Sequence, residues 1–401
     1  MIIKSIVLKT ASRCNLNCSY CYIYNKGDLS YQKQPKFLSK KLATKLLERV
    51  LSHMISNDLN TFVIVFHGGE PMLYGLQYYE FFINEYKRIF AHNPEKRIEF
   101  SMQTNGTLLT EENVTILTDL GIKIGVSMDS TKESNDNNRV YHNHRSSYDE
   151  ILSGLKIVSR ITGSSGILSV IDVAYSPEKS YDHIKQTQVQ FMDLLLPDET
   201  YDSIKEYDIR GKLGEWLCEM FDLWFHDKET KPNIRFFHAM IQVILGMGVG
   251  FDPFGKNYGD TIVVESNGDI QTNDGLRSCK NGITITNLNI LFNELAEIKD
   301  NPLGNLYINN HFSLPYICSK CPLESVCSGG YLVNRYSSKN GFDNESVFCK
   351  DMIKFISHVQ NTLVKLLNDD LGLEPMDSKE IIEYVDKLKN ERIPKPELMS
   401  F

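Results

Sequence analysis

The sequence feature that most constrains this chain is a run of three cysteines near its start, Cys14, Cys18 and Cys21, spaced C-x3-C-x2-C. The run follows the apolar segment Ile6-Val7-Leu8, so it lies on a loop that leaves a predicted strand. Three thiolates within eight residues can ligate three irons of a [4Fe–4S] cluster and leave the fourth iron open. Zinc is the alternative, but a structural zinc site prefers paired cysteines and a fourth ligand, and the next histidine is His53. The run therefore predicts an open iron–sulfur cluster.

The composition is that of a globular protein, because 42% of the 401 residues are hydrophobic and the net charge is −8 at pH 7. This acidic balance argues against nucleic acid as a partner, since the phosphates would repel the chain. No apolar run approaches the roughly 20 residues that a membrane helix needs, so we expect no membrane partner. The first residues predict a strand and no signal peptide, and we therefore expect a cytoplasmic protein.

The nine cysteines are unevenly placed along the chain: three lie near the start and four near the end. An odd, clustered set does not fit a disulfide framework, and clustered thiols in a reducing compartment indicate metal ligands. Cys218 and Cys279 stand alone, and we expect ordinary thiols in or near the core at both positions.

The pattern up to about residue 225 alternates short β-type runs with longer amphipathic stretches, which is typical of parallel βα units. Six such units predict an α/β fold, an open, partial (β/α)6 barrel with its chemistry at the carboxyl ends of the strands. We expect domains at 1–225 (the barrel), 226–259 (a helical bridge and loop), 260–352 (a small cysteine-rich α+β domain) and 353–401 (a helical tail without assigned chemistry).

The run Cys14–Cys21 resembles the signature of the radical S-adenosylmethionine (SAM) enzymes, in which an aromatic residue, here Tyr20, precedes the last cysteine. The resemblance implies that the open iron is chelated by the amino and carboxylate groups of SAM. A second motif follows the second predicted strand, and taken by itself it is a simple strand-exit turn. The motif consists of Gly68, Gly69, Glu70 and Pro71 and lies one βα unit after the cysteines. In this position it resembles the radical SAM motif whose backbone and carboxylate hold the amino group of the methionine part of SAM.

Three further residues follow the third and fourth predicted strands. Asn105 stands before a glycine, which alone indicates a turn, but the same position lines the SAM pocket in family members with an extra cysteine-rich SPASM domain. The resemblance implies that Ser127 contacts the SAM ribose or carboxylate and that Arg139 pairs with the carboxylate. A guanidinium suits bidentate pairing with an anion, whereas the alternative is a surface arginine in a polar loop.

A second set of cysteines lies near the end of the chain. Four thiols can close a complete cluster, although spacing alone slightly favours zinc. The set consists of Cys318, Cys321, Cys327 and Cys349. Its spacing resembles that of the ligands of the second auxiliary cluster in SPASM domains. A ligand of the first auxiliary cluster is replaced by Asn273, so we expect SAM and two [4Fe–4S] clusters as cofactors, one binding SAM and one auxiliary.

The neighbouring Asp274 matches the aspartate that formylglycine-installing relatives use as a base, although local sequence favours a turn residue. The tail segments 326–336 and 340–349, together with 14–28 and 194–198, resemble the FxsB-type maturases, which join an aromatic ring to a β-carbon in a ribosomal peptide. We therefore expect a peptide-modifying enzyme of RiPP biosynthesis that forms a three-residue cyclophane, with a precursor peptide and an external electron donor as partners. We also expect no peptide-recognition domain before the first strand.

Two other functions stay open from the sequence. A sulfatase-type maturase would oxidise a serine or cysteine to formylglycine, and it shares most of these motifs, but it normally carries both auxiliary clusters. Asn273 therefore speaks against it. The second alternative is a non-catalytic scaffold that holds two structural zinc ions.

Overall fold

The computed structural model describes residues 2–204, 209–367 and 373–401. The chain forms two compact units, and each is described by itself below. The first consists of 1–169, 189–191 and 260–308, and the second of 170–188, 192–259 and 309–401. Residues 205–208 and 368–372, which fall in the predicted barrel and the predicted tail, lie outside the described residues. The domain bounds expected from the sequence stay a prediction.

A parallel sheet forms the centre of the first unit and confirms the expected α/β class. Neighbouring strands along the chain pair in parallel from first to fifth. Alternate residues of the second and third strands are buried, as expected where one side chain in two faces the helices. The strands are β1 (Ser5–Ala11), β2 (Thr61–Gly68), β3 (Arg97–Thr104), β4 (Ile122–Ser127) and β5 (Gly166–Val170).

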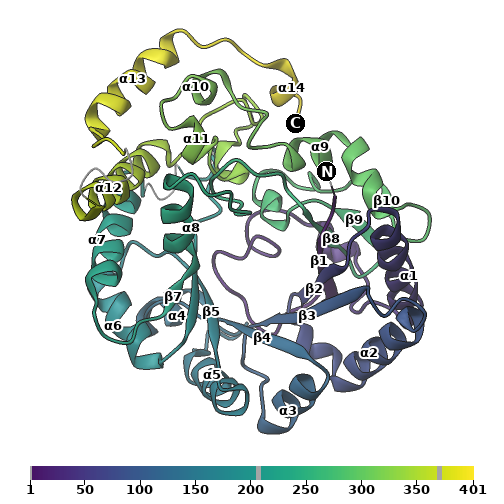
Figure 1. The fold of residues 1–401 in the computed structure, drawn as a ribbon. Helices are drawn as coiled ribbons and strands as arrows, with labels where there is room; N and C mark the ends of the chain where they lie inside the picture. Colours follow the sequence, from purple (N-terminus) through teal and green to yellow (C-terminus); the bar gives the residue numbers. More distant parts are fainter. Residues whose placement is uncertain (1, 205–208, 368–372) are drawn as a thin grey trace. The chain divides into compact units, whose positions relative to one another are not determined.

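Helices connect these strands and cover their outer face, as α1, α2, α3 and α5 do in Figure 1. Ser39 caps the first helix by accepting a hydrogen bond from the amide of Leu42. One helix replaces the expected polar loop before Arg139, because Thr131 caps it in the same way. The helices are α1 (Lys40–Ser56), α2 (Leu76–Phe90), α3 (Glu111–Asp119), α4 (Lys132–Asn138) and α5 (Tyr148–Thr162).

A hairpin from the later part of the chain extends this sheet at its free edge. Strand β8 (Thr261–Val264) pairs in parallel with β1, and β9 (Asp269–Gln271) returns antiparallel to it. The turn between them uses Gly268 at a φ of 88°, which glycine adopts readily. The unit ends with β10 (Leu288–Asn289) and short helices, η3 (Asp274–Ser278), η4 (Leu295–Asp300) and α9 (Pro302–Ile308). This pairing places η3 in the same unit as the first cysteine run.

The second unit is mainly helical around an aromatic core. Phe221, Phe236, Phe237 and Phe355 are fully buried and pack against one another. None of the helices in the described part of the chain is long and apolar enough to cross a membrane. Its elements include α6 (Pro177–Thr187), most of β6 (Phe191–Leu195), α7 (Lys212–His226), β7 (Asn233–Ile234), α8 (Arg235–Ile244), α10 (Tyr316–Ser319), α11 (Glu324–Cys327), η5 (Leu332–Arg335), α12 (Cys349–Leu367), α13 (Ser378–Asn390) and α14 (Pro396–Met399).

Candidate active site

The first cysteine run lies on the loop that leaves β1, as the sequence predicts. The loop is held by backbone hydrogen bonds to the segment after α4: the amide of Asn17 donates to the carbonyl of Val140 at 2.7 Å. Leu16 and Tyr141 form an isolated antiparallel bridge beside this bond. Inside the loop, the Cys21 amide donates to the Cys18 carbonyl at 3.1 Å. The three cysteines are therefore carried on an anchored loop.

The thiols of Cys14, Cys18 and Cys21 are free and only partly exposed. Burial raises the pKa of Cys14 to about 12, and the neighbouring Cys18 and Cys21 add to the shift. Thiols in this environment need a bound cation to become thiolates, and iron provides that charge. Within the described residues, no three Cys, His, Asp or Glu side chains form a group that could hold a single metal ion. Three partly buried cysteines on one anchored loop are the ligands that the predicted cluster needs, and the cluster stays a prediction.

Tyr20 and Arg139, both predicted to contact SAM, lie together beside this loop. Arg139 donates from Nη1 to the hydroxyl oxygen of Tyr20 at 2.9 Å, and that hydroxyl donates to Asp129 at 2.6 Å. Arg139 is buried at the end of α4, which excludes the alternative of a surface arginine. The chain thus holds a buried guanidinium next to Cys18, where a carboxylate ligand would be attracted.

Gly68 and Gly69 allow the end of β2 to approach the start of the cysteine loop. A Cβ atom on Gly68 would meet the carbonyl oxygen of Ala11 at 2.0 Å, and one on Gly69 would meet that of Arg13 at 2.3 Å. The Gly69 amide donates to Ala11 and the Glu70 amide to Arg13, at 2.8 and 2.9 Å. The two glycines therefore fix the cysteine loop against the sheet, an approach that no larger residue permits.

Glu70 joins the ends of β2 and β3. Its carboxylate is fully buried and accepts hydrogen bonds from the Met72 amide, the Thr104 hydroxyl and the Asn105 amide, at 2.7 to 2.9 Å. Burial raises the pKa of Glu70, although these three donors oppose the shift. Pro71 begins the short helix η2 (Pro71–Tyr74), which Glu70 caps. The expected motif is assembled, and its contact with SAM stays a prediction.

Asn105 connects this carboxylate to the cysteine loop. Its side-chain amide donates to Asn15 at 2.8 Å and lies 3.7 Å from the sulfur of Cys14. Ser127, at the end of β4, accepts a hydrogen bond from Gln103 at 2.8 Å. The structure thus brings Asn105 to the first cysteine, while Ser127 contacts a side chain that the sequence did not single out.

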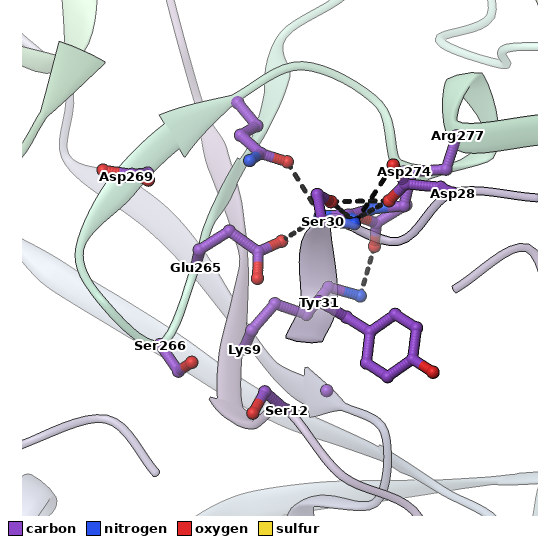
Figure 2. Close-up of polar contacts among 12 residues, drawn as sticks. Lys9, Ser12, Asp28, Ser30, Tyr31, Glu265, Ser266, Asp269, Asp274 and Arg277 are labelled. Carbon is purple, nitrogen blue, oxygen red and sulfur yellow. Dashed lines mark hydrogen bonds and ion pairs between the residues drawn. The ribbon is translucent and has the colours of Figure 1, made fainter. Parts of the chain in front are cut away.

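Asp274 lies at the start of η3 in a buried, charged environment (Figure 2). Its Oδ2 forms an ion pair with Lys9 of β1 and lies 3.4 Å from the hydroxyl of Tyr22, the residue after Cys21. Its Oδ1 lies 3.7 Å from Nε of Arg277. Burial opposes ionisation, but the charges of Lys9 and Arg277 outweigh it, so that the pKa of Asp274 lies below its usual value. Asp274 is therefore a buried carboxylate that is ionised at neutral pH.

Arg277 is the centre of this environment, and its side chain is 2% exposed. It donates from Nη1 to Asp28 and from Nη2 to Glu265, both at 2.6 Å. It also donates to Ser30 at 2.6 Å and to Gln271 at 2.9 Å. Figure 2 shows Asp28, Glu265 and Asp274 around this guanidinium. Because Asp28 belongs to the cysteine loop and Gln271 to β9, Arg277 ties that loop to the hairpin.

The second cysteine set lies within the second unit. All four thiols are free, and burial together with the neighbouring thiols raises the pKa of Cys349 well above its usual value. A fully buried guanidinium, Arg335, lies near Cys318 and Cys327, and burial lowers its pKa to about 10. A buried cation beside four thiols suits a site that is anionic when loaded. The donor set fits an auxiliary cluster, whose presence stays a prediction.

Sequence reasoning missed four residues of the first unit: Lys9, Tyr22, His67 and Arg277. The position of Lys9 inside the apolar strand β1 was the available signal, because an unpaired lysine is rarely buried. Arg277 was missed although Asp274 lies three residues before it, because its partner Asp28 is 249 residues away and Glu265 lies on another element. Long-range ion pairs of this kind become visible only in the folded chain.

The site can now be compared with known proteins. Residues 8–188 match the model of the radical SAM superfamily. The chain therefore contains a radical SAM domain, a family that implies SAM and a [4Fe–4S] cluster. The cysteine-type anaerobic sulfatase-maturating enzyme of Clostridium novyi (strain NT) is 27% identical over 88% of this chain and 94% of its own length. The serine-type enzyme of Bacteroides thetaiotaomicron is 24% identical over 86% of each chain.

Two solved structures of anSMEcpe have the same fold as this chain. The native protein with bound AdoMet has a TM-score of 0.79, and the form that also holds the Cp18Cys peptide has 0.78. They are 24% and 23% identical to this chain, and both alignments cover 91% of it and 99% of the solved chain.

These findings correct the expected function. Cyclophane formation is wrong as the main expectation, because sulfatase-maturating enzymes match nearly the whole chain. The expectation rested mainly on the tail segments 326–336 and 340–349, with 14–28 and 194–198, and on Asn273. Tail residues around a cluster site determine how that site is held, and they carry little information about which side chain a substrate presents. The FxsB-type resemblance is not supported beyond the superfamily.

Proposed function

We propose that this chain is a radical SAM maturase that oxidises a cysteine or serine side chain of a target polypeptide to formylglycine. The proposal is supported by the similarity to cysteine-type and serine-type sulfatase-maturating enzymes over most of both lengths. The observation that carries it is the buried carboxylate of Asp274, hydrogen-bonded by Tyr22 directly after the cysteine run. The same unit thus supplies the predicted radical site and a base.

The residues present fit the cofactors that the family implies. Cys14, Cys18 and Cys21 would hold the SAM-binding cluster, and Arg139 with Tyr20 would contact the carboxylate of SAM. When bound and reduced by an external donor, the cluster and SAM would supply the radical that removes a hydrogen atom from the Cβ of the substrate. Contacts to the rest of SAM are proposed for Gly68, Gly69, Glu70, Pro71, Asn105 and Ser127.

The remaining steps concern the substrate and this chain. After Cβ loses a hydrogen atom, a cysteine substrate must lose one electron and one proton to become a thioaldehyde. Water then replaces sulfur, giving the aldehyde and hydrogen sulfide, whereas a serine substrate gives the aldehyde directly. Asp274 would take the proton, because its ion pair with Lys9 keeps it ionised. An auxiliary cluster on Cys318, Cys321, Cys327 and Cys349 would supply a one-electron acceptor.

The experiment is an anaerobic reaction of the reconstituted chain with SAM, a reductant and matched peptides that carry cysteine, serine or alanine at one position. We expect an aldehyde at that position in the cysteine or serine peptide and none in the alanine peptide, detected by mass spectrometry and hydrazide capture. A product that loses two hydrogens but keeps its sulfur, without an aldehyde, would reject formylglycine formation. A chain that binds only zinc and releases no 5′-deoxyadenosine would support the scaffold alternative.

A further inference from the structure

The ion pair of Asp274 continues to a third titratable residue, His67 at the end of β2. Lys9 Nζ, paired with Asp274, also lies 3.1 Å from Nδ1 of His67. The same Nδ1 lies 3.1 Å from the carbonyl oxygen of Gly68. An ammonium group donates and a carbonyl accepts, so this one nitrogen faces a donor on one side and an acceptor on the other. If Nδ1 carries hydrogen, it donates to the Gly68 carbonyl. If Nδ1 carries no hydrogen, it accepts a hydrogen bond from Lys9.

His67 has more access to solvent than the other two side chains. The Asp274 and Lys9 side chains are 10% and 3% exposed, whereas His67 is partly exposed. Burial and the charge of Lys9 lower the pKa of His67 to about 3, so the imidazole is neutral at physiological pH and is able to accept a proton only transiently. Such a group passes a proton on to water and does not store it.

We propose that the proton taken up by Asp274 leaves through Lys9 to Nδ1 of His67, and that His67 then releases its Nε2 proton to solvent. Exchange with water returns the remaining hydrogen of the imidazole from Nδ1 to Nε2 before the next turnover. Lys9 gives a proton to His67 and receives the one held by Asp274, so Asp274 returns to its ionised form and the lysine keeps its charge. Proton number and charge balance, and no electron moves. The inference rests on the proposed function, in which Asp274 accepts a substrate proton in every turnover.

The other charged or titratable groups that face Asp274 do not offer this route. Arg277 lies beside Oδ1, but a guanidinium is not deprotonated in proteins. Glu265, at the end of β8, is bound to Arg277. Burial and the thiolates nearby disfavour ionisation of tyrosines on the cysteine loop such as Tyr24, and Tyr22 donates its hydroxyl to Asp274. Lys9 has both a transferable proton and an onward acceptor, Nδ1 of His67.

The first test reads the His67 tautomer and needs neither peptide nor SAM. The full-length chain, labelled with 15N-histidine, contains ten histidines, and H67Q identifies the signal of His67. In the wild type we expect a neutral imidazole with hydrogen on Nε2, because Lys9 donates to Nδ1. In K9M the hydrogen should move to Nδ1, which then faces only the Gly68 carbonyl. A wild-type imidazole with hydrogen on Nδ1 would overturn the proposal. Unchanged signals of the other histidines control for folding.

The second test measures repeated turnover, because a proton path through Lys9 and His67 and a purely structural role of these residues predict different results. K9R keeps the positive charge but has no transferable proton, and H67Q removes the onward acceptor. Both should form the first aldehyde per chain and then slow by roughly ten-fold or more relative to the wild type in later turnovers, because Asp274 stays protonated. K96M and H53Q are matched controls, since both replace buried residues elsewhere in the first unit, and they should turn over normally.

The outcomes separate the two proposals. If K9R turns over repeatedly like the wild type, the charge of residue 9 is sufficient and the proton path is wrong. If K9R also loses the first turnover, Lys9 has a structural role and the path is equally rejected. If the wild type makes no aldehyde at all, the proposed function fails, and the tautomer of His67 still decides whether Lys9 donates to it.

Discussion

Replacing Arg277 by methionine should destabilise the first unit strongly at neutral pH. The side chain is 2% exposed and pairs with two carboxylates that are themselves almost fully buried, Asp28 and Glu265 at 0% and 5%. R277M keeps most of the volume but leaves these charges without their cation. Removing one partner of a buried ion pair costs about 3–5 kcal/mol, and solvent screening is small at this exposure. We therefore expect the free energy of unfolding to fall by about 3–5 kcal/mol at pH 7.5.

The loss should depend on pH with a defined sign. Although burial opposes it, hydrogen bonds from Ser30 and Gly282 and the charge of Arg277 hold the pKa of Asp28 below its usual value. A carboxylate with a depressed pKa stabilises the fold at pH values above its unfolded pKa, and this stabilisation is lost as the pH falls. Without Arg277, Asp28 and Glu265 protonate more readily. The difference between wild type and R277M should therefore shrink as the pH falls from 7.5 toward 4.5.

The assay is urea unfolding followed by circular dichroism at both pH values, with hydrogen exchange of β1 and β9 as a local readout of the first unit. R88M is the control, because Arg88 on α2 is largely exposed and forms its ion pair with Glu85 at the surface, and it should change little. A loss below about 1 kcal/mol for R277M at pH 7.5, or a loss that is equal at both pH values, would refute the reasoning.

Three further predictions concern the site. C14A should hold about half of the roughly eight irons of the wild type and release no 5′-deoxyadenosine, measured by iron analysis and chromatography. D274N should still cleave SAM but form no aldehyde, so the ratio of aldehyde to 5′-deoxyadenosine should fall toward zero, and an unchanged ratio would remove Asp274 from the reaction. E70A should lower both thermal stability and SAM affinity, because the amides of Met72 and Asn105 lose a buried acceptor. Calorimetry measures both effects, and unchanged values would contradict the role of Glu70 in joining β2 to β3.

The parts of the fold that the sequence predicted are those with strong local patterns. Helices α1 and α2 have such patterns, because apolar residues recur at helical spacing in both and Ser39 marks the start of α1. Helix α4 was missed because its Asn-rich sequence is typical of a loop, and only the cap from Thr131 indicates a helix. The pairing of β8 with β1 joins residues more than 250 positions apart, which no local pattern specifies.

In the candidate site, too, the residues with a local sequence pattern were predicted and those that depend on long-range contacts were not. The cysteines and the Gly68–Pro71 motif were found from spacing, since the chemistry of a cluster dictates how its ligands are arranged along a loop. The partners of Asp274 were not found, because Lys9 and Arg277 acquire their roles only when β1, β8 and η3 meet. The product was also misjudged: motifs that generate a radical are shared among enzymes whose substrates present different side chains to it.

The central claim is that this chain removes hydrogen from the Cβ of a cysteine or serine and leaves an aldehyde there. The most direct measurement uses a cysteine peptide with deuterium on both Cβ positions of that residue. We expect one deuterium in 5′-deoxyadenosine, the second retained on the aldehyde carbon, and release of the sulfur. Deuterium transfer to 5′-deoxyadenosine with the sulfur retained and a new carbon–carbon bond in the peptide would contradict it.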